Sequence, residues 1–459
     1  MKKLILTLIS LMAASGMYAQ ILVSPSLYDA IQQAIMNDVD IQNNHLEIEK
    51  MEMKQKGIKQ KFLPRLEASA MYAYLNNELT VDVPTQTLPL TGIQLFDGKT
   101  TFDNSGQAFV GGLKLNQVIF SGGQITNGAK ALKYKNEGTA YLMENQKDEI
   151  IKDIIISFDQ LALLHEAEKL LDNSEKRLNK ETERVEKAIS AGLAIPYDRD
   201  KIKLAQLELA SKRKDVESKK ELLVLKLIQA TKLDKSTILN TVYQLEPIIV
   251  QNNLSVDNKN EIKALEAFKT ANEYAIKKEK GSLLPNIGAF ASYQYASVFD
   301  LKSEVHLNQI NRNAEFRLNE LTLHPNFMVG IGMKWSIFEG FERKEKIKEA
   351  QLSQQQIDLK LNDAKEKLDL LLAKNQSEYQ TATEQMTIHQ QRKQIAENNN
   401  TLAQKQYANG LMGINNRLEA ENDTFKASFD WYEAIAKQRE KAIETYQSTG
   451  TLTQYLTVK

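Results

Sequence analysis

The stretch Phe327–Gly340 reads FMVGIGMKWSIFEG, and from Phe327 to Ile337 an apolar residue occupies every second position. The residues between them include Gly330, Gly332, Lys334 and Ser336, which are small or polar. A period of two predicts a β-strand with one apolar and one polar face. The segment 341–409 that follows contains no Gly and no Pro. It predicts a very long helix, about 100 Å at ~1.5 Å per residue.

The same pattern occurs earlier in the chain, at a constant offset. The earlier strand carries apolar residues on one face and polar residues on the other, and a polar, proline-free segment follows it to about Ser190. Gly122 stands where Gly340 stands in the later copy. The sequence therefore predicts an internally duplicated protein that is mainly helical, with two β-hairpins. The alternating residues of the earlier strand are Phe109, Leu113, Leu115 and Ile119 against Lys114 and Asn116.

Composition narrows the class of protein. The 59 basic and 59 acidic side chains balance, so nothing indicates binding to nucleic acid. The absence of Cys excludes disulfides and thiolate chemistry. Lys2 and Lys3, the apolar run 4–14 and the small residues before Gln20 predict a signal peptide at 1–19, rather than a frayed helix. Because no other segment has 18 consecutive apolar residues, any membrane span in the mature chain must consist of strands.

The pattern divides the mature chain into two repeats. Residues 20–232 are expected to form a helix, a β-hairpin at 65–120 with a long loop at 76–107, a long helix at 124–190, a tip at 191–197 and a return helix. A connector is expected at 233–256. Residues 257–450 repeat the plan with a hairpin at 286–338, a polar loop at about 300–325, a helix at 341–408 and a tip at 409–414. Residues 451–459 are expected to form a C-terminal tail.

The expected helices and the expected strands each indicate how the chain packs. Leu164, Leu171, Leu178 and Val185 recur at intervals of seven, which predicts coiled-coil-like packing of the long helices. Four strands cannot close a barrel, and an open sheet would expose unpaired edges to lipid, so the chain is expected to oligomerise through its strands. The polar residues of the strands would then face a water-filled lumen. The alternative is a soluble four-stranded sheet on a helical body. The expected lumen positions are Lys114, Asn116 and Lys334.

At several places the sequence resembles the TolC family of outer-membrane efflux proteins. The resemblance lies in Phe62-Leu63-Pro64, in the strand endings 117–124 (QVIFSGGQ) and 335–340 (WSIFEG), and in the breaks 191–195 (AGLAI) and 407–411 (YANGL). It covers both repeats. It implies a homotrimer in the cell outer membrane, with a 12-stranded β-barrel and an α-helical barrel projecting into the periplasm. It also implies an efflux channel for small molecules, partnered by a periplasmic adaptor (membrane fusion) protein and an inner-membrane transporter.

The resemblance also assigns roles to particular residues. The two inter-helix breaks would form periplasmic tips that dock the adaptor. The gate would lie just beyond the second tip, where Asn416 and Met412 depart from the family's acidic and basic residues and leave the charge of the gate open. The implied docking residues are Gly192, Leu193, Gly410 and Leu411, and the implied gate residues are Asp198, Tyr407, Asn416 and Glu419.

Two other functions stay open from the sequence. The chain could be an exit duct for type I protein secretion, or a periplasmic coiled-coil adaptor or scaffold without a pore. Enzymatic chemistry is not expected. The five His residues lack metal-ligand spacing, and Gly330-x-Gly332 lacks the third glycine of a nucleotide-binding loop. Neither a cofactor nor a metal is therefore expected.

Overall fold

The computed structural model describes residues 21–87, 94–241, 243–251, 253–307, 312–450 and 452–458. The expected signal peptide 1–19 lies outside these residues. So do 88–93 and 308–311 within the two expected loops, 242 and 252 in the expected connector, and 451 and 459 in the expected tail. The chain forms two compact units. One comprises residues up to 51, 134–270 and 355–459, and the other comprises 52–133 and 271–354.

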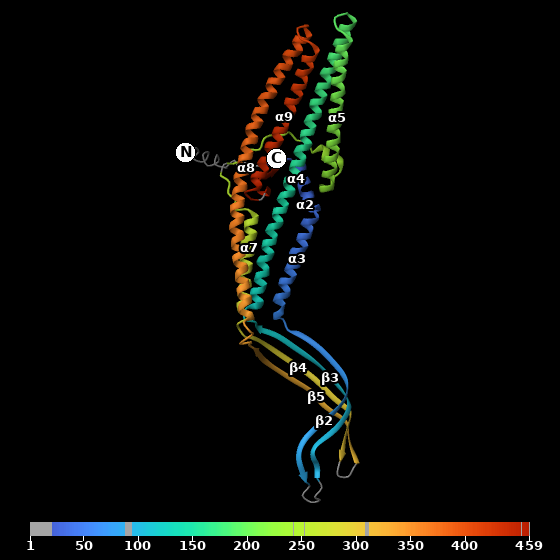
Figure 1. Cartoon of the computed structure of the whole chain (residues 1–459), viewed down its shortest axis with the longest axis vertical. Helices are drawn as coiled ribbons and strands as arrows, with labels where there is room; N and C mark the ends of the chain where they lie inside the picture. The colour runs from blue at the N-terminus through green and yellow to red at the C-terminus, as the bar shows by residue number, and fades with distance from the viewer. Residues whose placement is uncertain are drawn as a thin grey trace, which may run out of the picture. The chain divides into compact units, whose positions relative to one another are not determined.

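Eight α-helices occur in the described residues (Figure 1). None of them combines the length and the hydropathy needed to cross a bilayer. The two longest, α4 and α8, begin and end close to the ranges expected from the sequence, as do the tips that follow them. The helices are α2 (Pro25–Asn37), α3 (Val39–Lys59), α4 (Gln124–Ser190), α5 (Pro196–Thr231), α6 (Lys235–Asn240), α7 (Asn260–Gly281), α8 (Glu342–Ala408) and α9 (Ile414–Gln447).

Local sequence explains where the first helices begin and end. The Ser24 hydroxyl accepts a hydrogen bond from the Leu27 amide at 3.2 Å, and Pro25 occupies the first turn of α2, where its missing amide costs nothing. The chain leaves helical geometry at Asp38, whose carboxylate accepts from the Ile41 amide at 2.9 Å and starts α3. The weak point expected near 37–40 is therefore a helix boundary.

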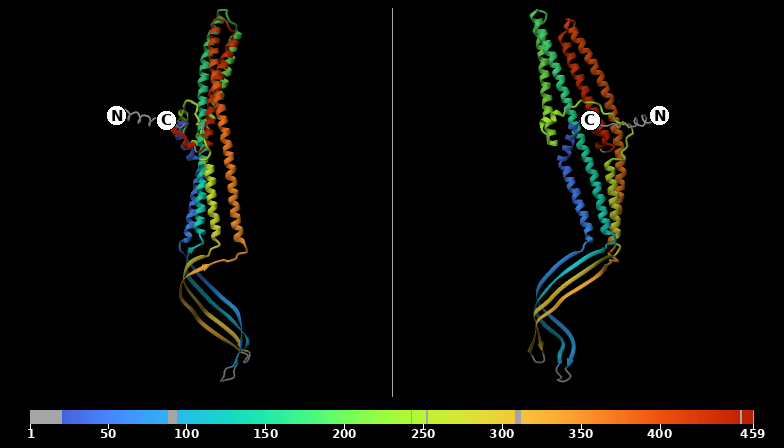
Figure 2. Two further views of the ribbon diagram at one scale, coloured as in Figure 1. Left: turned by 90° about the vertical axis from the view of Figure 1, so that its left-hand side faces the viewer. Right: turned by 180° about the vertical axis from the view of Figure 1, so that it is seen from behind.

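The first unit contains the largest hydrophobic core. It forms where the middle of α4 packs against α2, α5 and α9. All four heptad residues of α4 are buried. Near the tips, α4 forms a hairpin with α5, and α8 forms a hairpin with α9 (Figure 2). Strand β1 (Ile21–Val23) pairs in parallel with β6 (Leu456–Val458), so the first and last described segments close on each other.

A buried carboxylate holds the C-terminal segment in place. Asp148 of α4 is only 1% exposed, and its Oδ1 accepts a hydrogen bond from the Leu452 amide at 2.8 Å, while Oδ2 has no hydrogen-bond partner. Burial raises the pKa of Asp148 to about 7, although the Leu452 amide and the charge of Lys259 oppose the rise. Lys259 is itself buried and donates to the Gln447 carbonyl at 2.6 Å.

The second unit contains one antiparallel four-stranded sheet of order β2-β3-β4-β5. Its strands are β2 (Arg65–Thr87), β3 (Gln94–Phe120), β4 (Asn286–Leu307) and β5 (Arg312–Lys334). The sequence prediction of loops at 76–107 and 300–325 is wrong over the described residues, because the strands continue through most of both segments. The final strand also ends at Lys334 rather than at 338.

Cross-strand pairing accounts for the longer strands. Asn76 lies opposite Ser105 and Asn77 opposite Asn104, so residues that favour turns in isolation sit in a continuous ladder. Strand propensity is weak and depends on neighbours, and two polar strands that satisfy each other's backbone groups can override it. The first hairpin therefore extends well beyond the alternating apolar residues that identified it.

Two glycines allow a close backbone approach in this unit, where β3 turns into α4 and α7 ends. A Cβ on Gly122 would lie 2.2 Å from the Gly281 carbonyl oxygen, and a Cβ on Gly281 would lie 2.4 Å from the Gly122 carbonyl oxygen. The backbone of Gly122 also has a φ angle of +59°, a conformation that residues with a side chain rarely adopt. The junction between sheet and helices thus depends on two residues without side chains.

The substitution Gly281→Ala is expected to lower the free energy of unfolding by about 2 kcal/mol, because the backbone must move to relieve the overlap. Gly57→Ala is the matched control. It lies in α3 of the same unit with nothing within 4 Å of its Cβ position, and the better helix former should stabilise by about 0.5–1 kcal/mol. Chemical denaturation of both variants measures the difference. Equal stability of the two would show that the glycine contact contributes nothing.

Candidate functional site

The register of the sheet places the three expected lumen residues on one face. Lys114 lies opposite Glu67 on β2 and Ser292 on β4. Asn116 lies opposite Arg65, and Lys334 opposite Asn286, in the same alternating set. Since directly paired residues share a face, Lys114, Asn116 and Lys334 belong to a single polar face.

The opposite face is apolar and uncovered. Two rows cross all four strands, Leu66–Leu115–Ala291–Val329 and Ala68–Leu113–Tyr293–Phe327. Ile331 of the same face is 74% exposed. A soluble monomer rarely exposes so large a continuous apolar surface. The outer edges of β2 and β5 have no strand partner in the described residues. The sheet therefore has one apolar face, one polar face and two unpaired edges.

The two tips share one backbone geometry. At the first, the Leu193 amide donates to the Ala188 carbonyl at 2.8 Å and the Gly192 amide to the Ile189 carbonyl at 3.0 Å. At the second, Leu411 and Gly410 donate in the same pattern to Gln406 and Tyr407. Both glycines have positive φ, +75° and +71°. These are Schellman motifs, which strongly favour glycine at this position.

The leucines of the tips are unusual for this motif. The residue after the glycine commonly packs back onto the last helical turn. Leu193 is instead 84% exposed and Leu411 is 78% exposed. Each tip therefore presents one leucine side chain to its surroundings.

The four expected gate residues separate into two pairs. Asp198 accepts from the Ile195 amide at 3.4 Å and so caps α5, while Tyr407 packs beside a cluster that includes Val185 and Ile202. Burial raises the pKa of Tyr407, and the carboxylates of Glu181 and Asp198 raise it further, so Asp198 and Tyr407 occupy one neighbourhood. Asn416 and Glu419 are exposed on α9.

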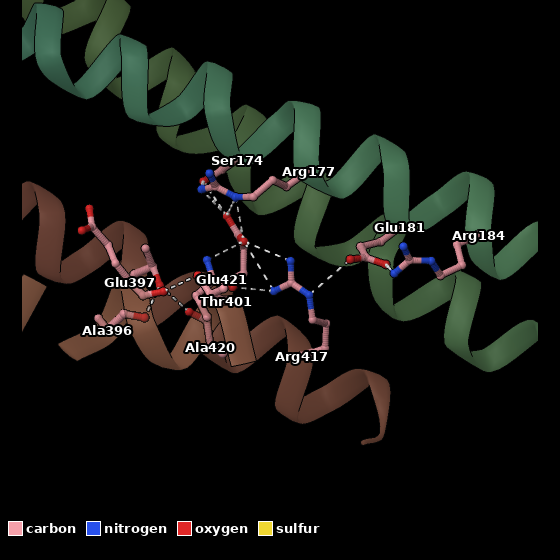
Figure 3. A network of polar contacts seen from close by, with 12 residues as sticks. Ser174, Arg177, Glu181, Arg184, Ala396, Glu397, Thr401, Arg417, Ala420 and Glu421 are labelled. Atoms are coloured by element: carbon pink, nitrogen blue, oxygen red, sulfur yellow. Dashed lines mark hydrogen bonds and ion pairs between the residues drawn. The ribbon is translucent and has the colours of Figure 1, made fainter. Parts of the chain in front are cut away.

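A buried ionic cluster lies beside these residues and was not expected from the sequence (Figure 3). Its centre is Glu421 of α9. Its carboxylate accepts hydrogen bonds from Ser174 at 2.9 Å and from Arg177 Nε at 2.7 Å, both on α4, and from Asn400 of α8 at 3.2 Å. The cluster thus joins three helices and both hairpins.

Arg417 extends the cluster along α9. It is the largest fully buried side chain and is 1% exposed. Its guanidinium donates to the Asn400 side chain at 2.9 Å and lies 3.3 Å from both Glu181 and Glu421. Glu181 in turn pairs with the more exposed Arg184 at 3.0 Å. Each buried charge therefore has an opposite charge beside it.

The electrostatics of the cluster favour the charged state of Glu421. Burial acts to raise the pKa of this carboxyl, but the hydrogen bond and charge of Arg177, together with Ser174 and Arg417, outweigh burial and lower it. Truncating one member of such a pair leaves an uncompensated buried charge. The cluster therefore joins α9 to α4 at the end of the hairpins that carries the expected gate.

The sequence carried a signal for this cluster. Ser174 and Glu181 lie three residues after the heptad leucines Leu171 and Leu178, in the second core position of the repeat. Polar residues there must be buried, and both are 2% exposed. Buried polar groups need partners, so the heptad itself predicts that α4 meets donors from another helix. It does not identify Arg417 as one of them.

Within the described ranges, no group of three or more His, Asp or Glu side chains could hold a metal ion. The ionisable residues near the tips form salt bridges, helix caps or exposed surface.

Comparisons with known proteins agree on one class. Residues 30–219 match the family described as outer membrane efflux protein. No curated protein sequence matches the chain significantly. Among solved structures, the chain is similar to CusC, with a TM-score of 0.71, 14% identity, and coverage of 95% of this chain and 95% of that one.

Two further channels have the same fold. The outer membrane channel CmeC of Campylobacter jejuni has a TM-score of 0.67 and 14% identity, over 93% of this chain and 86% of CmeC. The open state of the MtrE outer membrane channel of Neisseria gonorrhoeae has a TM-score of 0.63 and 14% identity, over 96% of this chain and 94% of MtrE. The matched family and these structures are outer-membrane channels, not enzymes.

Proposed function

We propose that this chain, whose residues 30–219 match the outer membrane efflux protein family, is the outer-membrane channel of a tripartite efflux pump. Three copies would each contribute four strands to a twelve-stranded barrel in the outer membrane. Their helices would form an α-barrel in the periplasm. One observation carries the proposal: the sheet has an exposed apolar face, a polar face and two open edges.

The strand edges motivate the oligomer. In hydrocarbon every backbone amide and carbonyl must be paired, and four strands are too few to close on themselves. Joining the β5 edge of one copy to the β2 edge of the next pairs both edges. The apolar rows would then face lipid, and Lys114, Asn116 and Lys334 would face the lumen.

Outer-membrane fractionation followed by electron microscopy of the detergent-solubilised particle tests the assembly. We expect an elongated particle with threefold symmetry in the outer-membrane fraction. A soluble monomer or dimer in the periplasmic fraction would overturn the channel and favour the alternative of a coiled-coil adaptor or scaffold.

The proposed cargo is small molecules, supported by the efflux description of the family. The runner-up is protein secretion, which export assays of the intact pump would distinguish.

The tips are the proposed docking site for the periplasmic adaptor, through Gly192, Leu193, Gly410 and Leu411. An inner-membrane transporter would complete the pump. The support is the pair of Schellman motifs that each present an exposed leucine.

The double substitution Leu193→Asp and Leu411→Asp should abolish efflux in cells and cross-linking to the adaptor. It should change the thermal midpoint little, because neither leucine packs within the chain. Leu22→Asp, an exposed leucine away from the tips, is the control. Normal efflux by the tip variant would exclude the leucines from docking.

The gate is proposed at Asp198, Tyr407, Asn416 and Glu419. Asp198 and Tyr407 would lock the tips, and three copies of Glu419 would create a negative ring that favours cations. The support is the shared neighbourhood of Asp198 and Tyr407 and the exposure of Glu419 on α9.

Asp198→Ala combined with Tyr407→Phe should raise single-channel conductance in planar bilayers several-fold. Glu419→Gln should reduce block by multivalent cations about tenfold. Glu366→Gln, an exposed carboxylate in the middle of α8, is a control for the charge change. Unchanged conductance and unchanged block would remove these residues from the gate.

A further inference from the structure

A cavity of about 600 Å³ lies in the second unit, where the polar face of the sheet meets the ends of the helices. Three lysines line it: Lys61 after α3, Lys278 of α7 and Lys334 at the end of β5. Its walls are otherwise largely apolar, with Ile125 and Val118 among them. None of the described residues that line the cavity is a carboxylate, so it combines positive charge with a hydrophobic interior.

The lysines differ in their pairing. Lys278 makes an ion pair with the neighbouring Glu279 at 2.9 Å. Lys61 and Lys334 make no ion pair with the described residues. The first turn of the long helix α4 also lines the cavity through Gln124 and Ile125, and the N-terminal end of a helix carries partial positive charge. The unneutralised charge of this region is therefore positive.

Glycines leave the space open. Gly128, Gly288 and Gly332 all line the cavity. At Gly332 an added Cβ would meet only the Phe290 ring, at 3.9 Å, an ordinary contact distance. A side chain could therefore be accommodated at Gly332 without moving the backbone, yet the residue there is glycine and the space stays open.

We propose that this cavity binds an amphiphilic organic anion: a carboxylate or sulfonate with an aromatic or aliphatic body. Its volume lies within the range of about 300–1,000 Å³ typical of small-molecule sites, which are mostly apolar with a few polar groups that fix orientation. Lys61 and Lys334 would contact the anionic group, and Ile125 and Val118 the apolar body. The inference rests on the proposed channel, because the polar face would make the cavity a cargo subsite facing the lumen.

Binding to the protein reconstituted in lipid nanodiscs tests the subsite directly. Naphthalene-2-sulfonate, followed by its fluorescence anisotropy, should bind saturably, while naphthalen-2-ylmethylammonium should only partition into lipid. Lys61→Gln combined with Lys334→Gln should weaken anion binding at least tenfold, because both charge-assisted contacts are lost. Gly332→Val should weaken it to a similar degree by filling the cavity. Lys54→Gln removes a lysine from α3 outside the cavity and should leave the affinity unchanged.

The outcomes separate this inference from the proposed function. Equal binding of anion and cation, or an anion affinity that survives both the lysine and the glycine substitutions, would overturn the subsite. Planar-bilayer conductance of the unmodified protein tests the channel independently. Conductance without anion binding would support the proposed channel and overturn the subsite. Anion binding without conductance would overturn the proposed channel.

Discussion

Replacing Arg417 with Met is expected to lower the free energy of unfolding of the helical unit by about 3–5 kcal/mol, the cost of breaking a buried ion pair by removing one partner. Arg417 is 1% exposed and lies between the carboxylates of Glu181 and Glu421. Without it, Glu181 retains only the more exposed Arg184, and the Asn400 side-chain oxygen loses its donor. Methionine fills similar volume, so the loss reports charge rather than a cavity.

Two controls make the Arg417 experiment specific. Arg199 pairs with Asp200 on the surface of α5, and Arg199→Met should cost less than about 1 kcal/mol, as exposed pairs do. Adding Glu181→Met to Arg417→Met should recover part of the loss, since it removes the buried carboxylate whose remaining ion-pair partner is the more exposed Arg184. Chemical denaturation in detergent measures all three variants. Equal effects of Arg417→Met and Arg199→Met would show that the buried cluster does not hold α9 to α4.

The second large effect concerns pH and Asp148. Its pKa is about 7 in the folded chain, against an ordinary value of 3.8. Between these values the folded state holds a proton that the unfolded state has released, so stability must fall as pH rises from about 4 to about 7. The difference corresponds to as much as about 4 kcal/mol at pH 8. At that pH the charged carboxylate is buried with one oxygen unpartnered.

Asp148→Asn should remove this dependence. The asparagine side-chain oxygen can still accept the Leu452 amide, and the side chain carries no charge to bury. The stability advantage of the variant over the unmodified protein should be clearly larger at pH 8 than at pH 5. Asp153→Asn, an exposed position of the same helix, should leave the pH profile unchanged. Denaturation curves at pH 5 and pH 8 decide the matter, and an Asp148→Asn profile parallel to that of the unmodified protein would contradict it.

Because Asp148 holds Leu452, its titration acts on the C-terminal segment. Leu452 belongs to the main core, and β6 pairs with β1 a few residues later. Hydrogen exchange at these amides should therefore rise with pH in the unmodified protein more than in Asp148→Asn. This readout distinguishes a local opening of the segment from a change in global stability.

Much of the architecture could be predicted from the sequence because local chemistry decides it. Alternation with period two predicted the four strands and the two faces of the sheet. The long segments without proline predicted α4 and α8, and the heptad predicted the buried stripe of α4. Gly192 and Gly410 marked both tips, since a Schellman motif needs a residue that tolerates positive φ. Each of these features depends on residues a few positions apart.

Other features depended on partners far away in the chain. The strands extend through Asn76 and Asn77 because β3 supplies backbone partners that no local pattern reveals. Gly122 and Gly281 matter because their backbones meet. Arg417 looks like an ordinary polar residue of α9 until α4 and α8 remove water from it. Asp148 is a helix-surface acid in the sequence and a buried, half-satisfied carboxylate in the fold. Backbone periodicity is a short-range property that the sequence by itself determined, whereas desolvation of a charge requires several elements to converge, and only the tertiary structure decided which residues would bear it.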